Sequence, residues 1–218
     1  MSSPSVAVLV SGGLDSDVLF ADLAERYGNV LPIYIRQGLA WETVELHWLR
    51  RFLNALNNPA IRPLRVLQVP MADVYGAHWS VRGSRVPGKR SPDKAVYLPG
   101  RNLILTVKTA VLCAQEKIPT IAVGSLDHNP FADATPAFFR RWAAALSSGL
   151  NAPLKIIAPY RRSSKEHVIR RGRAWPLELS FSCIQPKGRL HCGQCNKCAE
   201  RRRAFRRAGV FDRTAYAG

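Results

Sequence analysis

Four cysteines near the C-terminus have the spacing of a metal site. They follow the pattern Cys-x8-Cys-x2-Cys-x2-Cys, at Cys183, Cys192, Cys195 and Cys198. Thiolates are soft ligands, and four of them suit tetrahedral Zn²⁺ with no open coordination position. The spacing therefore predicts a structural zinc, with an iron–sulfur cluster as the main alternative. We interpret His191 as a bystander and the fifth cysteine, Cys113, as a residue of the core.

A second pattern, near the N-terminus, can bind phosphate. The apolar run 6–10 is typical of a strand buried on both faces, and it leads through Ser-Gly-Gly-Leu-Asp-Ser into helical spacing over 17–27. Backbone N–H groups of a glycine turn at a helix N-terminus form a cradle for an anion. An ordinary turn capped by Asp15 or Ser16 is the alternative. We predict nucleotide binding by Val10, Ser11, Gly12, Gly13, Leu14, Asp15 and Ser16.

Strands and helices alternate along the chain and must position these groups. Strands are predicted at 30–35, 64–69, 120–123 and 154–158, and helices at 42–57, 103–117, 136–147 and 163–171. This rhythm predicts an α/β fold, with a Rossmann-like, mostly parallel sheet and helices on both faces. We expect this domain to span 1–180 and a small zinc-binding segment to span 181–218. Segment 81–94 has no hydrophobic period and is expected to be a mobile loop, either a lid or simply disordered.

Other polar residues are expected at the carboxyl edge of the sheet, where ligands bind. Arginine at a strand-to-helix junction can fork onto a phosphate or carboxylate. An aspartate can accept hydrogen bonds from the amidine-like edge of a base, and a phenylalanine can stack on its ring. Taken alone, each of these residues is also compatible with an ordinary surface or loop position. The candidates for substrate binding are Arg101, Asn102, Asp127, Phe131 and Asp133.

The composition indicates a globular protein with a strongly basic surface. The chain has 218 residues, 47 % of them hydrophobic, and none of its apolar runs approaches the ~20 residues of a membrane helix, so we expect a soluble, cytoplasmic protein. The net charge is +17, and from Arg161 onward 15 basic residues stand against 4 acidic ones. A polyanionic substrate such as ATP and a nucleic acid are both compatible with this charge. We expect at most weak nucleic-acid binding.

Together these pieces resemble the 7-cyano-7-deazaguanine synthases, a family of PP-loop ATP pyrophosphatases in the queuosine pathway. The resemblance runs from Val6 to about Phe205, and its anchors are 11–16, Pro-Gly-Arg-Asn at 99–102 and Cys-Gly-Gln-Cys-Asn-Lys-Cys at 192–198. It implies that ATP adenylates the carboxylate of 7-carboxy-7-deazaguanine. Ammonia then gives an amide that is activated again and dehydrated to the nitrile, with release of AMP and pyrophosphate. It also implies Mg²⁺, a structural Zn²⁺, commonly a homodimer, and catalytic roles for Asp15 and Lys165.

The chain departs from the family pattern where substrate should lie. Residues 129–135 read Asn-Pro-Phe-Ala-Asp-Ala-Thr and lack the family's tyrosine and Cys-Arg, and the loop 36–42 also differs. A paralogue that acts on a related deazapurine or a macromolecule is therefore one alternative. A PP-loop RNA-modifying enzyme of the thiolation type is another. The third is a basic zinc-binding protein whose nucleotide site is vestigial.

Overall fold

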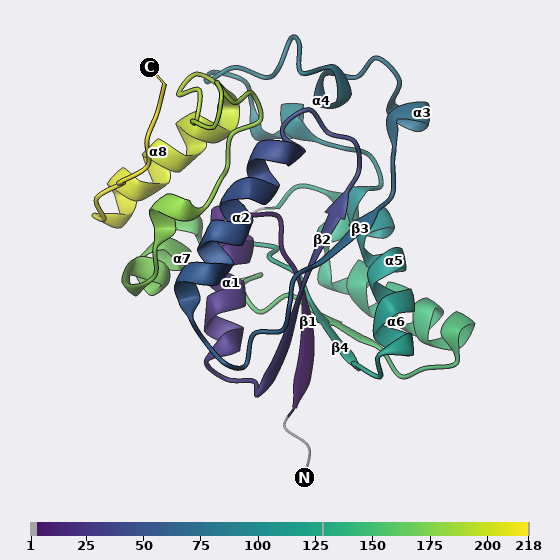
Figure 1. Cartoon of the computed structure of the whole chain (residues 1–218). Coiled ribbons are helices and arrows are strands. Elements are labelled where there is room, and N and C mark those ends of the chain that lie inside the picture. The colour runs from purple at the N-terminus through teal and green to yellow at the C-terminus, as the bar shows by residue number, and fades with distance from the viewer. Residues whose placement is uncertain (1–3, 128, 218) are drawn as a thin grey trace.

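The fold is built on one parallel sheet. The computed structural model describes residues 4–127 and 129–217. Its five strands run in the order β3-β2-β1-β4-β5, with β1 in the centre. Figure 1 labels the first four strands of the chain, β1 to β4. Ser5 of β1 pairs with Asn29 of β2, and Ala7 of β1 pairs with Ile121 of β4. The predicted Rossmann-like sheet is confirmed. The strands are β1 (Ser5–Leu9), β2 (Asn29–Arg36), β3 (Arg65–Gln68), β4 (Thr120–Ala122) and β5 (Lys155–Ile157).

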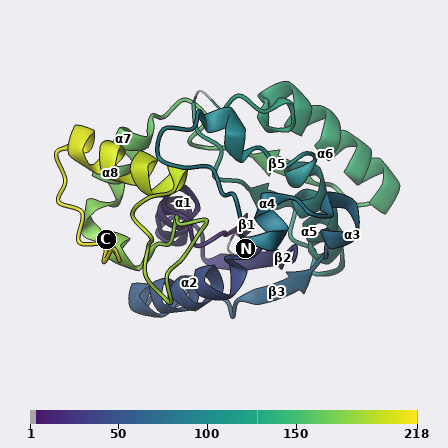
Figure 2. The same cartoon turned by 90° about the horizontal axis from the view of Figure 1, so that it is seen from above.

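Helices cover both faces of the sheet, because successive side chains of β1 point to opposite faces and are apolar on both. Val6 and Val8 face a core shared with α1 (Leu14–Ala24), α2 (Glu42–Leu56), α7 (Lys165–Arg171) and α8 (Asn196–Ala208). Ala7 faces the opposite core, shared with α5 (Arg101–Gln115) and α6 (Pro136–Leu150). Side chains of a strand alternate between its faces, so an unbroken apolar run requires cover on both. Figure 2 shows the two helix groups on either side of β1.

The segment predicted to be a mobile loop is held by hydrogen bonds. It begins within α4 (Trp79–Arg82), which follows the short α3 (Ala72–Tyr75), and it runs to a 3-10 turn at Asp93–Val96. Between these, Asn196 donates from its backbone N–H to the Pro87 carbonyl at 2.9 Å and from its side chain to the Ser91 carbonyl at 2.6 Å. Asn196 lies about 100 residues further along the chain, so no local sequence pattern could indicate these hydrogen bonds.

The C-terminal quarter packs into the main core. Phe205 and two alanines of α8 belong to the same buried cluster as Val6 and Val8 of β1. The guanidinium of Arg201, buried at 1 % exposure, donates to the Leu177 carbonyl and the Ser180 hydroxyl, both at 2.8 Å. The division predicted at residue 180 stays a prediction, and these contacts cross it. Among the described residues, none of the helices has the length and apolar character that crossing a membrane requires.

Gly172 provides a test of how tightly α1 and α7 pack. A Cβ atom at this position would lie 2.6 Å from Cγ2 of Val18 and 3.1 Å from Cδ2 of Leu177. We therefore expect Gly172→Ala to lower the free energy of unfolding by about 1–3 kcal/mol, measured by chemical denaturation. The matched control is Gly149→Ala in α6, where a Cβ meets nothing within 4 Å. It should leave stability unchanged or raise it by up to about 1 kcal/mol. Equal stabilities for the two variants would contradict the close packing.

Candidate active site

The turn between β1 and α1 leaves a helix N-terminus open to a ligand. Gly13 occupies the N-cap position of α1, and no side chain of the described residues caps this helix. The predicted alternative, a cap by Asp15 or Ser16, is therefore wrong. The Ser16 hydroxyl closes the turn on itself instead, since it donates to the Gly13 carbonyl at 2.9 Å and accepts from the Ser11 N–H at 3.1 Å. First-turn amides have no intrahelical acceptor, so they can donate to a phosphate.

Gly12 serves the turn through its backbone conformation. Its φ angle is +73°, and a Cβ atom there would lie 3.1 Å from the Glu45 carbonyl oxygen and 3.3 Å from Cβ of Leu49. The absent side chain thus makes room for α2. The Gly12 carbonyl also accepts a hydrogen bond from the Phe181 N–H, which joins the turn to the cysteine-bearing segment. Val10, Ser11, Gly13, Asp15 and Ser16 line the adjacent cavity, whereas Gly12 and Leu14 do not.

The cavity lies at the carboxyl edge of the sheet, over β2, β1 and β4, and has a volume of about 200 Å³. The start of α5 contributes Arg101 and Asn102, as predicted. Ser125 follows β4, and its hydroxyl is buried without a hydrogen-bond partner among the described residues, so a ligand can satisfy it. The order of the strands reverses at β1, and such switch points are where open α/β sheets bind ligands.

Lys165 supplies the positive charge beside the turn. It is the first residue of α7, and the Ser164 hydroxyl caps this helix by accepting from the His167 N–H at 3.2 Å. The Lys165 Nζ atom lies 3.2 Å from Oδ2 of Asp15 and 2.5 Å from Oε1 of Glu200. Burial by itself lowers the pKa of Lys165, but the two carboxylates hold it above its ordinary value. The lysine is therefore cationic at neutral pH.

Two glutamates of α2 form the acidic side of the cavity. Glu45 accepts a hydrogen bond from the Tyr34 hydroxyl at 2.7 Å, and Glu42 accepts from the Gly38 N–H at 3.1 Å and from the Gln37 N–H. Burial raises the pKa of Glu45 to about 7, against the opposing effect of Arg101. Sequence reasoning missed both glutamates. The helical spacing could have indicated their burial, because both glutamates lie on the same face of α2 as its buried apolar residues.

Three predicted substrate residues do not line the cavity. Both carboxylate oxygens of Asp133 accept hydrogen bonds from Asn102, at 3.0 Å from its backbone N–H and 3.3 Å from its side chain. Asp133 therefore caps the first turn of α5 and holds Asn102 in place. Phe131 packs on Tyr97 with ring centroids 4.8 Å apart, and the Asp127 N–H donates to the Ser163 carbonyl. Asn129 and Phe139 line the cavity instead.

The four cysteines form a closed set of sulfur donors. Their Sγ atoms all lie within 4.8 Å of one another. The Cys183–Cys195 and Cys192–Cys198 distances are 3.9 and 4.0 Å. Tetrahedral Zn²⁺ with Zn–S bonds of about 2.3 Å requires sulfurs about 3.8 Å apart, so the set fits this ion. Backbone N–H groups also donate to the sulfurs, for example from Cys192 to Cys183 at 3.3 Å. The cluster can hold a metal ion.

The remaining predictions about this segment concern His191 and Cys113. His191 lies outside the set of sulfur donors, and its Nε2 atom accepts a hydrogen bond from the Ser182 N–H at 3.1 Å. Its ring packs on Phe181 with centroids 4.5 Å apart. Cys113 is fully buried in the core between the sheet and α5. Both residues thus have structural surroundings, as expected.

The open helix N-terminus at the switch point of a parallel sheet can hold a polyphosphate. The positive charge beside it is that of Lys165, which belongs to α7 and not to the turn itself. This arrangement places the protein in the PP-loop class of ATP-dependent enzymes. The sequence profile of the family "Queuosine biosynthesis protein QueC" matches residues 5–209. The chain belongs to this family.

Individual relatives agree with the family match. A 7-cyano-7-deazaguanine synthase of Anaeromyxobacter sp. (strain Fw109-5) is 31 % identical, over 96 % of this chain and 94 % of the relative. A protein of the same name from Methanothrix thermoacetophila is 30 % identical, over 95 % and 96 %. Among solved structures, a 4-thiouridine synthetase in complex with RNA and ATP has a TM-score of 0.52 and 14 % identity. It aligns with 94 % of this chain but half of that protein, so this likeness shows the fold alone.

The raised pKa of Glu45 predicts a pH dependence of stability. A carboxyl group with a pKa of about 7 in the folded state, above its ordinary 4.5, binds more protons when folded. The contribution of Glu45 to the free energy of unfolding therefore decreases as the pH rises from about 4.5 to about 7. The unfolding free energy of Glu45→Gln minus that of the wild type should therefore rise by about 2 kcal/mol when the pH is raised from about 5 to about 8. Urea denaturation of both proteins measures this difference, in which other titrating groups cancel. Parallel pH profiles would contradict the assignment.

Proposed function

We propose that this protein adenylates the carboxylate of 7-carboxy-7-deazaguanine and converts it, with ammonia, into 7-cyano-7-deazaguanine. The products from ATP are AMP and pyrophosphate. The observation that carries the proposal is the family match, which covers residues 5–209 of this chain. The site agrees with it, because the PP-loop leaves a helix N-terminus open beside Lys165. Relatives aligned over nearly their full length bear the name 7-cyano-7-deazaguanine synthase.

The physical task of the site is to turn a carboxylate into an electrophile. The carboxylate oxygen attacks the α-phosphorus of ATP and expels pyrophosphate. The product is a mixed carboxylic–phosphoric anhydride, from which AMP leaves readily when ammonia attacks the carbonyl carbon. In this proposal the first-turn amides of α1 and the Lys165 ammonium stabilise the pyrophosphate as it leaves, which the open helix N-terminus and the nearby lysine support. Mg²⁺ bound with ATP supplies further charge neutralisation. Asp15, whose Oδ1 atom has no hydrogen-bond partner among the described residues, is the carboxylate that can contact it.

Arg101 is suited to hold the carboxylate of the acceptor. It lies in the cavity at the start of α5, and its Nε atom donates to the Gln37 side chain at 3.3 Å. This contact orients the guanidinium and leaves its terminal nitrogens for a forked interaction. The altered stretch 129–135 reaches the cavity through Asn129, so it is the place where specificity for a related deazapurine would arise.

The thiolation-type alternative has less support. Four of the five cysteines form the sulfur cluster, and the fifth, Cys113, is fully buried in the core. Among the described residues, no thiol therefore lies free beside the cavity to carry sulfur. Homodimer formation, weak nucleic-acid binding and a cytoplasmic location stay predictions. For the cysteine cluster we propose Zn²⁺, because the sulfur spacing matches its tetrahedral geometry.

The products of turnover test the assignment of the loop. With Mg²⁺, ammonia and the deazapurine carboxylate, ATP should yield AMP and pyrophosphate, measured by chromatography. Lys165→Met should lower the turnover rate about a hundredfold or more, because it removes charge stabilisation from the leaving group. The control is Lys155→Met, which alters an exposed lysine of β5 and should leave the rate unchanged.

Other products would point elsewhere. Formation of ADP would contradict the PP-loop assignment. AMP that appears only with a different acceptor would retain the loop assignment and show that the stretch 129–135 has changed the specificity. No turnover with any acceptor, while metal is bound and the fold is intact, would favour the binding-protein alternative.

The metal content gives an independent test. The purified protein should be colourless and hold about one zinc ion per chain by elemental analysis. Cys195→Ser should aggregate or lose stability rather than lose turnover alone, because metal binding contributes to the folding free energy of such a segment. A brown protein that contains iron would contradict the zinc assignment and favour an iron–sulfur cluster.

A further inference from the structure

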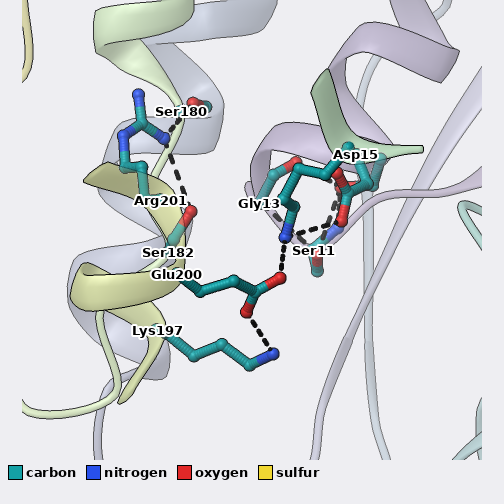
Figure 3. Close-up of polar contacts among 10 residues, drawn as sticks. Ser11, Gly13, Asp15, Ser180, Ser182, Lys197, Glu200 and Arg201 are labelled. Carbon is teal, nitrogen blue, oxygen red and sulfur yellow. Dashed lines mark hydrogen bonds and ion pairs between the residues drawn. The ribbon is translucent and has the colours of Figure 1, made fainter. Parts of the chain in front are cut away.

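A chain of ion pairs joins the PP-loop to the helix that carries two of the cysteines. From Asp15 it passes to Lys165, then to Glu200 and finally to Lys197. Figure 3 labels Asp15, Glu200 and Lys197 and shows the contact between the last two. The last two residues belong to α8, whose N-cap is Cys195 and whose first turn contains Cys198. The PP-loop and the cysteine cluster are thus connected through side chains of α1, α7 and α8.

Glu200 is held at both of its carboxylate oxygens. Oε1 lies 2.5 Å from the Lys165 Nζ atom, and Oε2 lies 2.7 Å from the Lys197 Nζ atom. The side chains of Lys165 and Glu200 are 19 and 22 % exposed, so the pair is partly removed from water and is screened by salt less than a fully exposed pair. The carboxylate cannot rotate without breaking one of the two contacts. It therefore restricts where the Lys165 ammonium can lie.

The position of Glu200 depends in turn on the start of α8. The Cys195 sulfur accepts from the Cys198 N–H at 3.4 Å, so the two cysteines define the first turn. A metal ion held by all four sulfurs would tie this turn to Cys183 and Cys192. Further along, buried Arg201 and Phe205 fix the helix against the core. Glu200 lies between these two anchors, and a metal ion bound to the cysteines would strengthen the first of them.

We propose that Glu200 is a positioning residue through which the metal-bound cysteine cluster sets the position of Lys165, so that metal binding and ATP binding are linked. The inference rests on the proposed function in one respect, that Lys165 contacts the phosphates of ATP. Linkage is reciprocal: if the metal favours the lysine position that binds ATP, then ATP strengthens retention of the metal. This reciprocity provides a measurement that needs no turnover.

The first experiment follows zinc release from the full-length, zinc-loaded protein to a chromogenic chelator, with and without Mg-ATP and with no acceptor present. In the wild type, ATP should slow release about fivefold or more. In Glu200→Gln, ATP should leave the release rate unchanged. The matched control is Glu166→Gln, which removes the same charge next to Lys165 from a glutamate that lies 3.8 Å from Arg207. This control should behave as the wild type.

The second experiment separates positioning from binding in turnover. Glu200→Gln should lower kcat about ten- to a hundredfold with a much smaller change in KM for ATP, because misplacement of an orienting group mainly affects the transition state. Glu200→Asp, which keeps the charge on a shorter side chain, should recover part of the lost rate. These measurements use the AMP assay with the proposed acceptor.

Two results would overturn the inference. One is ATP-slowed zinc release of equal size in the wild type and in Glu200→Gln. The other is zinc release from the wild type that ATP does not affect. Failure of the proposed function gives a different pattern. In that case the wild type forms no AMP with the deazapurine carboxylate, while ATP still slows zinc release and Glu200→Gln still abolishes that effect.

Discussion

The contact between Lys165 and Asp15 is the interaction on which the site depends. An open helix N-terminus attracts phosphate but leaves its own acidic residue, the half-buried Asp15, beside the anion that it must bind. Burial raises the pKa of this carboxyl, and Lys165 opposes that rise. The lysine thus offsets the charge of the carboxylate and adds a cation for the polyphosphate. Because it comes from α7, the site forms only when α7 is packed against α1.

The parallel sheet makes this packing specific. Val6 and Val8 of β1 contact the core that also contains Val168 and Ile169 of α7. The same core continues to Phe205 of α8, so the C-terminal helix is placed relative to β1 by apolar contacts. Hydrophobic burial brings the segments together without directional preference. The directional contacts, from the Gly12 carbonyl to Phe181 and from Lys165 to Glu200, then define how the PP-loop faces the C-terminal segment.

The charges are distributed unevenly between the surface and the cavity. The chain as a whole is basic, with a net charge of +17, yet Glu42, Glu45 and Asp17 are buried beside the PP-loop. Burial raises the pKa of both Asp17 and Glu45. The pKa of Glu45 rises to about 7, so protons neutralise part of its charge near neutral pH. The cavity can therefore contain several carboxyl groups without repelling a polyphosphate strongly.

The sequence by itself determined the features that depend on neighbouring residues. The buried strand, the glycine turn and the following helix are local, as is the cysteine spacing, and each predicted the element or donor set that the structure contains. The family resemblance, which joined these pieces, predicted Lys165 as a partner for the loop. The parallel order of the strands followed from the alternation of strands and helices, because crossover connections allow few other arrangements.

Only the tertiary structure decided which polar groups face one another. Asp133 looked free to bind a base, but both of its oxygens bind Asn102. Segment 81–94 looked unstructured, but Asn196 holds it in place. Nothing in the sequence singled out Glu45 or Glu200, but they contact Tyr34 and Lys165. In each case the partner lies 11 to more than 100 residues away. Local sequence patterns indicate which residues of a segment face water and which face the core. A hydrogen bond between distant residues depends on where two specific atoms lie, and this is decided by how the segments pack.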